Sequence, residues 1–424
     1  MTQTAHPPRQ DSDSSDARGL AARVSLGRLF AVPSTEFVMI ASTAILLTLF
    51  GLVMVLSATS ANPTAPFEGA IRQSVFAAIG IPLMLLVSRL PMAFLKRIAW
   101  PALILAIAFQ LLVFVPGLGV SSYGNQNWVS IAGFQLQPSE FLKLALAIWI
   151  AMVLLRKQAR LGIWHHVFIP IVPVSVLAIG TVIAGGDLGT AMVLVLVVLG
   201  GLFFSGVKLR LFILPLAGGV AGVLGYALSS ENRMRRIIAA FNPDDCDYYR
   251  ECFQSTHGIW GMASGGIFGV GLGNSQEKYG WLPAAANDYI FAIVGEELGL
   301  IGCLLVLVLF GCFAVGAFHI IRKTDDAFVR VATGGITVWI IGQALFNIGV
   351  VLRVFPVMGV PLPFMSQGGT ALLSVLLGCG VLLAFARTLP APQPRGAQTR
   401  GAQTRPAAAS KTTAARSTRG KVTG

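Results

Sequence analysis

The stretch "LPAAANDYIFAIVGEELGLIG", residues 282–302, decides the fold because it joins a polar loop to a long apolar helix. From Tyr289 onward the chain is apolar for about 30 residues, more than the ~20 that a membrane-spanning helix needs. Yet Asp288 opens the expected helix, and Glu296 and Glu297 lie about 12 and 13.5 Å further along its axis. A carboxylate at the centre of a membrane helix costs about 2.5–3.5 kcal/mol, so each acid needs a partner or a function.

The composition of the whole chain indicates a membrane protein. Of its 424 residues, 55% are hydrophobic and only 12% are charged, whereas soluble domains have roughly 25% charged residues. The net charge of +13 would fit a nucleic-acid-binding protein, but the tail from Arg387 onward has eight Lys and Arg residues and no acid, and supplies +8 of that charge. A basic tail of this kind fits anionic lipid headgroups or membrane topology better, so we expect no nucleic-acid partner.

Apolar windows along the chain predict an all-α polytopic membrane protein with about ten transmembrane helices. Lys and Arg cluster after every even-numbered window, which places the N- and C-termini in the cytoplasm by the positive-inside rule. The large loop between the seventh and eighth helices, residues 230–287, is then extracytoplasmic, and Asp288 lies at the outer membrane surface. The windows lie near 37–57, 70–88, 98–115, 140–155, 167–184, 190–206, 211–229, 289–318, 329–351 and 367–386.

These windows divide the chain into three parts. Residues 1–36 and 388–424 are predicted to be polar cytoplasmic tails, and residues 37–387 the transmembrane domain. The tails contain few large apolar side chains to bury, so we expect them to be disordered. The first apolar run is long enough to remain as a signal anchor, so no cleavable signal peptide is expected.

The three acids of the opening stretch have different candidate roles. Asp288 sits where a carboxylate can cap the free N–H groups of a helix, and where a general base could act in a partly dehydrated cleft. Glu296 and Glu297 are too deep to cap the helix, and buried carboxylates need partners. We expect a structural ion pair for at least one of them, with Lys143, Arg353 or a loop cation.

The predicted outer loop opens with a cluster of arginines, Arg233, Arg235 and Arg236, on the side of the membrane where topology gives no reason for one. Arginine matches phosphate oxygens bidentately, so the cluster is a candidate site for a phosphorylated lipid. The alternatives are contact with lipid headgroups in general and pairing with the acids at 244–245.

Two further features of this loop leave alternatives open. Cys246 and Cys252 lie outside the cytoplasm, where they form either a disulfide or two free thiols. The glycine-dense run from Gly258 to Gly273 allows the backbone to approach a ligand or a neighbouring helix closely.

Six segments, in the same order and topology, together resemble the SEDS family, whose members include FtsW, RodA and SpoVE. The resemblance covers about residues 37–387. The segments are "GLVMVLSATS", "NWVSIAGFQLQPSEFLKLAL", "GDLGTAMVL", "MASGGIFGVGLGNSQEKYGWLP", "NDYIFAIVGEELGLIG" and "NIGVVLRVFPVMGVPLPFMSQGG".

The resemblance implies a ten-helix glycosyltransferase that polymerises lipid II on the outer face of the bacterial cytoplasmic membrane. Asp288 matches the essential acid of the family, the base that deprotonates the acceptor sugar, and undecaprenyl diphosphate is the implied leaving group. Several residues match family positions that contact the substrate, including the cations for its diphosphate. These candidates are Arg233, Arg236, Lys143, Lys278, Ser366 and Gln137.

The chain departs from the family pattern at several positions, which puts family-style contacts there in doubt but leaves Asp288 in place. These positions are Asn127, Gly185, Gly186, Ala284, Ala286, Asn287 and Arg353.

The resemblance also implies partners and leaves other functions open. A class B penicillin-binding protein, which is a transpeptidase, and other division proteins are the expected partners, and a divalent cation such as Mg²⁺ or Mn²⁺ is compatible although no His/Asp cluster specifies one. "GEELG" and "GLVMVLSATS" are more like the division members of the family, whereas "FPVMGVPLPF" is more like the elongation members. We therefore expect a septal polymerase, with an elongation polymerase, a lipid II flippase and a divisome scaffold as alternatives.

Overall fold

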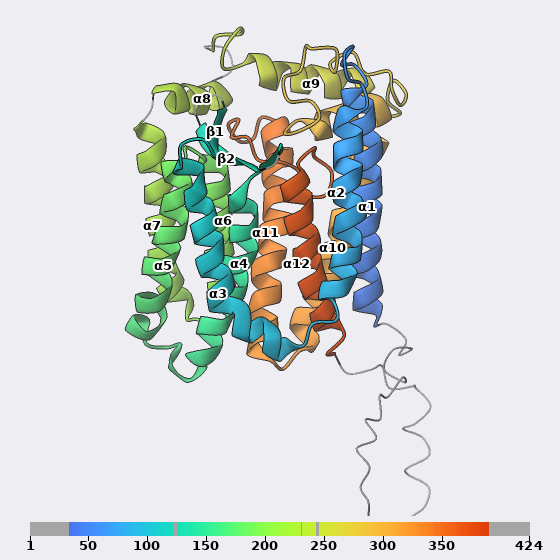
Figure 1. Ribbon diagram of the computed structural model, residues 1–424. Coiled ribbons are helices and arrows are strands. Elements are labelled where there is room, and N and C mark those ends of the chain that lie inside the picture. Colours follow the sequence, from blue (N-terminus) through green and yellow to red (C-terminus); the bar gives the residue numbers. More distant parts are fainter. Residues whose placement is uncertain (1–33, 123–124, 132, 230, 243–245, 390–424) are drawn as a thin grey trace, which may run out of the picture. The chain divides into compact units, whose positions relative to one another are not determined.

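The computed structural model describes residues 34–122, 125–131, 133–229, 231–242 and 246–389 (Figure 1). The two predicted polar tails lie outside this part of the chain except for a few residues at their inner ends. Two of those residues, Thr35 and Glu36, belong to the first helix instead of a tail, because the Ser34 side chain caps that helix and the helix begins at Thr35.

Within the described residues, each of the ten predicted windows overlaps one helix. Eight helices are long and apolar enough to cross a membrane, and α6 and α7 contain shorter apolar runs. This is an all-helical polytopic architecture with one small sheet. The ten helices are α1 (Thr35–Thr59), α2 (Glu68–Val87), α3 (Met92–Leu111), α4 (Pro138–Arg156), α5 (Trp164–Ala184), α6 (Leu188–Phe204), α7 (Leu209–Leu228), α10 (Ile290–Lys323), α11 (Ala327–Val351) and α12 (Gly369–Ala386).

Short elements lie between these helices. Leu112–Phe114 and Gln158–Arg160 are 3-10 turns, and α8 (Glu231–Phe241) and α9 (Phe253–Gly265) belong to the loop before α10. Figure 1 shows α8, α9 and the strands at the same end of the bundle, called here the α9 end.

Helices α4, α11 and α12 form the centre of the bundle. In the apolar windows of α4 and α12, 83% of residues are buried, and in α11 72%, against 28–44% in the five other long helices. The outer helices therefore present apolar side chains such as Leu105, Ile169 and Val308 outward, as a bilayer solvent requires.

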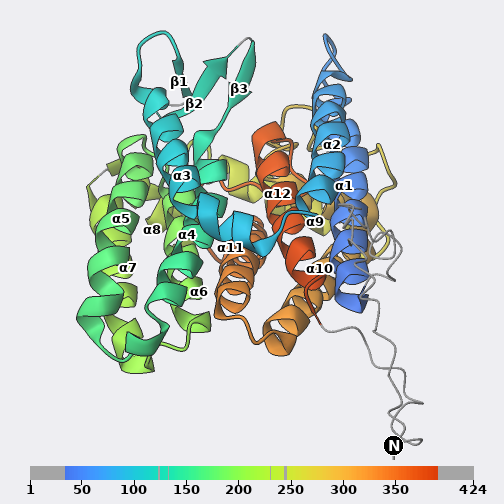
Figure 2. The same cartoon turned by 60° about the horizontal axis from the view of Figure 1, so that its bottom comes forward.

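A three-stranded antiparallel sheet between α3 and α4, which was not predicted, accompanies the helices (Figure 2). Its strands are β1 (Gly119–Ser122), β2 (Asn125–Ile131) and β3 (Phe134–Leu136), in the order β1-β2-β3, with Val129 opposite both Gly119 and Leu136. The sheet is joined to the α5–α6 turn because the Gln126 N–H donates to the Gly185 carbonyl at 2.7 Å. Among the strand residues whose burial is described, only Val129 is fully buried, and the alternating pattern of a strand is weak in the sequence.

Helix α10 is broken at Gly299, which has φ 67° and ψ −161°. The glycine-dense run after α9 fills the break: the N–H groups of Val270 and Gly271 donate to the carbonyls of Glu296 and Glu297 at 2.9 and 3.0 Å. A Cβ on Gly269 would collide with the Glu297 backbone, so the glycine is required for this close approach. The glycine-dense run was predicted to approach either a ligand or a neighbouring helix closely. In the structure it approaches a helix, α10.

Candidate active site

Asp288 lies in the turn before α10, and its carboxylate forms no hydrogen bond with the described residues. Tyr289 is the N-cap residue of α10, and no side chain caps the helix. The capping role for Asp288 is therefore wrong. The side chain is partly exposed, and its Oδ2 faces Gly359, where an added Cβ would lie 3.6 Å away. The carboxylate is left free for a ligand.

The backbone around Asp288 is held firmly even though its side chain is free. The Asn347 amide donates to the Asp288 and Val360 carbonyls, both at 2.7 Å, and so joins the turn to the loop after α11. Ser366 Oγ donates to the Asn287 carbonyl at 2.6 Å and accepts from the Leu362 N–H at 2.7 Å. These contacts fix the position of the carboxylate before any substrate binds, which is what a positioned base requires.

Burial, and after it the negative charge of Asp187, raises the pKa of the Asp288 carboxyl from 3.8 to about 6. Desolvation disfavours the charged form, and a second negative charge nearby disfavours it further. At neutral pH the group is still mostly ionised, yet it binds a proton more strongly than an ordinary aspartate. This is the combination that a general base needs.

Asp187 is a second acid of this site, and the sequence reasoning did not select it. It caps α6, accepting from the Thr190 N–H at 2.8 Å, and its other oxygen accepts from the Gln137 amide at 3.1 Å. Gly189, two residues after Asp187, packs against the Met358 carbonyl beside Gly359, so α6 reaches the loop that Asp288 faces. An acid directly before an apolar helix, in "GDLGT", was the available signal.

Lys143, predicted to contact the diphosphate or to pair with Glu296 or Glu297, is buried in α4. Its Nζ donates to Glu140 Oε1 at 2.7 Å and to Gln343 Oε1 at 2.8 Å. Gln343 in turn donates to the Pro361 carbonyl at 2.8 Å. Lys143 thus supports the loop after α11 through Gln343, and its partner is Glu140.

Glu297 is paired with Lys278 from the loop after α9. The Lys278 Nζ lies 3.3 Å from Glu297 Oε1, and both side chains are completely buried. Ser57 Oγ of α1 donates to the same carboxylate at 2.6 Å. The Lys278 Nζ also donates to the Gly273 carbonyl at 2.6 Å, so the predicted diphosphate contact of Lys278 is not open in this structure.

Hydrogen bonds satisfy Glu296, and no cation among the described residues pairs with it. It accepts from Ser275 Oγ at 2.5 Å and from the Gln276 N–H at 2.7 Å. Together with Glu297 it joins the first segment of α10 to the loop after α9 and to α1. Both acids are at most 2% exposed, which leaves them no access to a substrate.

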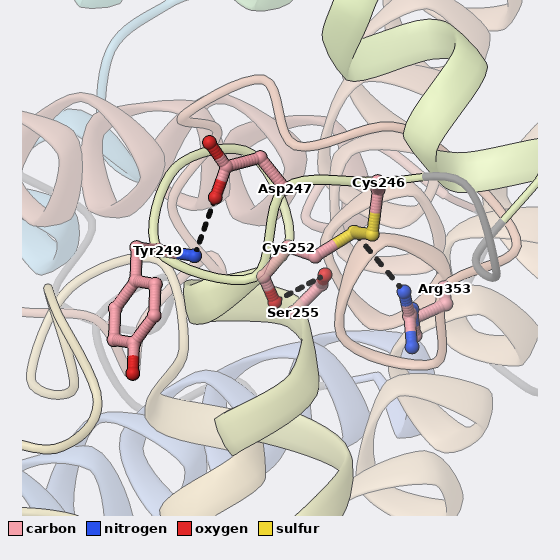
Figure 3. Close-up of a disulfide and its surroundings, with 6 residues drawn as sticks. All are labelled: Cys246, Asp247, Tyr249, Cys252, Ser255 and Arg353. Atoms are coloured by element: carbon pink, nitrogen blue, oxygen red, sulfur yellow. Dashed lines mark hydrogen bonds between the residues drawn. A yellow bond between two sulfur atoms is a disulfide. The ribbon is translucent and has the colours of Figure 1, made fainter.

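The structure joins Cys246 and Cys252 by a disulfide, shown in Figure 3. Cys252 is the N-cap residue of α9, so the bond attaches the start of that helix to the preceding loop. Arg353 lies beside it and donates from Nη2 to Cys252 Sγ at 3.5 Å. The ion pair predicted for Arg353 is wrong among the described residues: the arginine, held at φ 59°, contacts the disulfide instead.

The arginine cluster lies on α8 at the α9 end. Arg236 is exposed, and Arg235 pairs with Glu231 at 2.6 Å on the same helix. Arg233 belongs to α8, but its side chain lies outside the described part of the structure. Asp244 and Asp245, the alternative partners of the cluster, also lie outside it.

No group of three or more His, Cys, Asp or Glu side chains within the described residues is arranged to hold a metal ion. The site contains two acids, Asp187 and Asp288, which is fewer than three. Both carboxylate oxygens of Asp187 already accept hydrogen bonds, from the Thr190 N–H and the Gln137 amide. The described side chains define no metal centre.

Comparison with known families decides the classification. The family model for cell cycle proteins of the FtsW/RodA/SpoVE type matches residues 37–390. The chain belongs to the SEDS family. A curated SEDS relative from Mycobacterium bovis, named probable peptidoglycan glycosyltransferase FtsW, is 35% identical over 388 residues, which are 90% of this chain and 73% of the relative. The enzyme class predicted from the sequence is the one that this relative's name gives.

Solved structures show the same fold as this SEDS protein. RodA of Thermus thermophilus aligns with a TM-score of 0.62 at 23% identity, covering 85% of this chain and 98% of that one. A chain from a study entitled "Structural coordination of polymerization and crosslinking by a peptidoglycan synthase complex" aligns with a TM-score of 0.68 at 23% identity, covering 84% and 98%. The chain is therefore a multi-pass membrane protein with a RodA-like fold.

Proposed function

We propose that this chain is a peptidoglycan glycosyltransferase that polymerises lipid II on the outer face of the bacterial cytoplasmic membrane. The observation that carries the proposal is the free carboxylate of Asp288, whose backbone is fixed by Asn347 and Ser366 and whose pKa is raised to about 6. Family membership supplies the substrate class. Burial and pairing make Glu296 and Glu297 unsuitable for the same role.

In the proposed reaction, Asp288 takes the proton of the 4-hydroxyl group of the acceptor GlcNAc. The freed oxygen attacks C1 of the donor MurNAc from the face opposite its diphosphate. The bond between C1 and the diphosphate oxygen breaks, and undecaprenyl diphosphate leaves with the electron pair. The new glycosidic bond therefore has inverted configuration at C1. Positioning and proton removal are the contributions that these side chains make.

The candidate substrate-binding residues differ in whether their side chains are free to contact a substrate in this structure. Arg236 is exposed on α8 and, with Arg233 on the same helix, is our candidate for the diphosphate. Lys143 and Lys278 are already paired with acids, so their diphosphate contacts stay predictions that require these pairs to open. We propose that Gln137 and Ser366 act through Asp187 and the Asp288 turn, which they hold in place.

We also propose an orientation for the chain in the membrane. Ten spans with both termini in the cytoplasm place the α9 end outside, where exported lipid II is available. Lys96, Lys157 and Arg322 belong to the opposite end of the bundle, in agreement with the positive-inside rule. Labelling of single cysteines introduced at Asn274 and at Asp325 in intact cells tests this orientation, because only the first should react with an impermeant thiol reagent.

We also propose that the protein acts at the division septum together with a class B penicillin-binding protein. The FtsW name of the relative and the "GEELG" segment support division, and the synthase-complex title supports a crosslinking partner. Depletion of the protein in its own host distinguishes the roles: filaments with blocked septa support division, and rounded cells support elongation.

The decisive test is polymerisation of lipid II by purified protein, alone and with the cognate penicillin-binding protein. Asp288→Ala should abolish glycan product, whereas Asp325→Ala, which removes an exposed acid at the opposite end of the bundle, should not. Normal polymerisation by a folded Asp288→Ala variant would show that Asp288 is not the catalytic base.

The same variant separates the alternatives. Proteoliposomes with lipid II in one leaflet would show flipping without glycan product if the chain were a flippase. A scaffold predicts that Asp288→Ala still complements loss of the protein in cells, because recruitment does not need the base.

A further inference from the structure

A cavity of about 540 Å³ opens at the α9 end of the bundle, apart from the groups assigned above to proton transfer. Its walls come from the α1–α2 turn, the first turns of α2, the loop at Lys278–Gly280 and Gln367. Figure 1 shows that turn beside the loop that follows α9. The volume lies within the range of about 300–1,000 Å³ that small-molecule sites have.

The cavity is connected to the turn that carries Asp288. Gln367, one of its lining residues, donates from its backbone N–H to the Ala286 carbonyl at 2.8 Å, two residues before Asp288. The neighbouring Ser366 holds the Asn287 carbonyl. A chain-like ligand that occupies the cavity would therefore extend towards the proposed reacting centre along this contact.

The lining favours a neutral polar ligand over an anion. The positive charge of Lys278 is compensated by Glu297, and the remaining cation, Arg72, shares the wall with Glu68. The Glu68 carboxylate has no hydrogen-bond or ion-pair partner among the described residues, and neither does the side-chain amide of Gln367. Both are therefore available to hydroxyl and amide groups of a ligand.

An aromatic ring completes this lining. Tyr279 is 64% exposed and, like Asn62, lines the same cavity. The C–H face of a sugar ring packs on an exposed aromatic ring, while its hydroxyl and N-acetyl groups bond to carboxylate and amide side chains. An aromatic face, two amides and a free carboxylate in one cavity match this chemistry.

Two glycines keep the cavity open. A Cβ on Gly69 would lie 2.6 Å from Thr59 Cγ2 and 2.8 Å from Gln367 Nε2, so a larger residue would force these two lining residues to move. Gly280 has φ 95°, a conformation that sets the direction of the chain after Tyr279 and that other residues rarely adopt.

We propose that this cavity is a saccharide subsite, which holds N-acetylated sugars of the glycan strand outside the reacting centre. The inference rests on the proposed function, since that function supplies the strand. Glu68, Gln367 and Tyr279 are its binding residues. By retaining the strand between additions, the subsite sets the length of the product instead of the rate of one coupling step.

Binding of a soluble N-acetylglucosamine tetrasaccharide to the full-length protein in nanodiscs tests the site without catalysis. Tyr279→Ala and Glu68→Gln should each raise Kd about tenfold, equivalent to one lost contact of ~1.4 kcal/mol. Tyr249→Ala is the matched control, because it removes an 85% exposed tyrosine of the same loop that does not line the cavity. Glu68→Gln is isosteric and exposed, so it keeps the test valid even if Tyr279→Ala misfolds.

Strand length is the second measurement. With lipid II as substrate, both variants should give strands several-fold shorter than those of the wild type, whereas the control Tyr249→Ala should give strands of wild-type length. Unchanged Kd and unchanged strand length in both variants would overturn the inference, as would absence of tetrasaccharide binding to the wild type.

The two proposals fail in different ways. Tetrasaccharide binding should persist in Asp288→Ala, which makes no polymer. A wild type that binds the tetrasaccharide through Glu68 and Tyr279 but makes no glycan product would refute the proposed function and leave the saccharide site standing.

Discussion

The two ends of the stretch 282–302 differ in how their acids are satisfied. At its beginning Asp288 is partly exposed and unbonded, with a raised pKa. Eight and nine residues later, Glu296 and Glu297 are buried and bonded to Ser275, Ser57 and Lys278. A carboxylate that is saturated by the protein stabilises the fold, whereas one that the protein fixes but leaves unbonded is available for chemistry.

The substitution with the largest expected effect is Asp288→Asn, which tests whether the unbonded carboxylate is the catalytic base. General base catalysis contributes about 10²–10⁴-fold, so polymerisation should fall by that factor. The thermal unfolding midpoint should stay the same or rise slightly, because the folded protein no longer holds a desolvated charge that it does not pair. A rate within tenfold of the wild type would show that Asp288 is not the base.

Glu297→Ala tests the opposite end through stability. It leaves the Lys278 ammonium buried without its partner, a change that costs about 3–5 kcal/mol when one half of a buried pair is removed. The unfolding midpoint in detergent should drop sharply. Glu297→Ala combined with Lys278→Met should recover most of the loss, and a double variant as unstable as the single one would contradict the pairing.

Gly299→Ala tests the break that separates the two glutamates from the span of α10. The backbone of Gly299 occupies a region that is essentially limited to glycine, so alanine should cost about 1–3 kcal/mol in unfolding free energy. Gly311→Ala, in the same helix with open space around it, is the control and should be neutral or slightly stabilising. Equal stability of the two variants would argue against the break.

The smallest expected effect concerns pH. Because the folded pKa of Asp288 is raised to about 6, the base form is lost as pH falls through 6, and kcat/KM should rise with pH to half of its plateau there. Asp187→Asn removes the negative charge that helps to raise this pKa, so the acidic limb should move to lower pH. Movement to higher pH would contradict the proximity of the two acids.

The sequence predicted the helices because each apolar window is long and continuous. The cost of an acid near a span drew attention to Asp288, and the resemblance of "NDYIF" to the family motif made it the candidate base. The sequence did not predict the sheet at 119–136, since only Val129 is fully buried among the described residues there and no strong alternation exists. Nor did it predict the break in α10: "GEELGLIG" has the composition of a continuous helix, and only the docking of the preceding loop makes the broken form favourable.

Side-chain partners were the least predictable part of the site. Lys143 and Arg353 have the right charge to pair with Glu296 or Glu297, but Lys143 pairs with Glu140, three residues earlier on its own helix, and long-range packing places Arg353 beside Cys252. Asp187 was missed because its role depends on proximity to Asp288, about a hundred residues away along the chain. Charge and spacing predict that a buried acid has a partner, and tertiary contacts decide which one.

The break in α10 also bears on how the protein is made. The N–H groups that donate to the carbonyls at this break belong to Val270 and Gly271, which leave the ribosome before α10 does. The carbonyls of Glu296 and Glu297 therefore meet their donors as soon as the helix emerges. A circularly permuted chain in which residues 253–289 followed α12 would insert α10 with those carbonyls unpaired, and we expect such a chain to be degraded during membrane insertion.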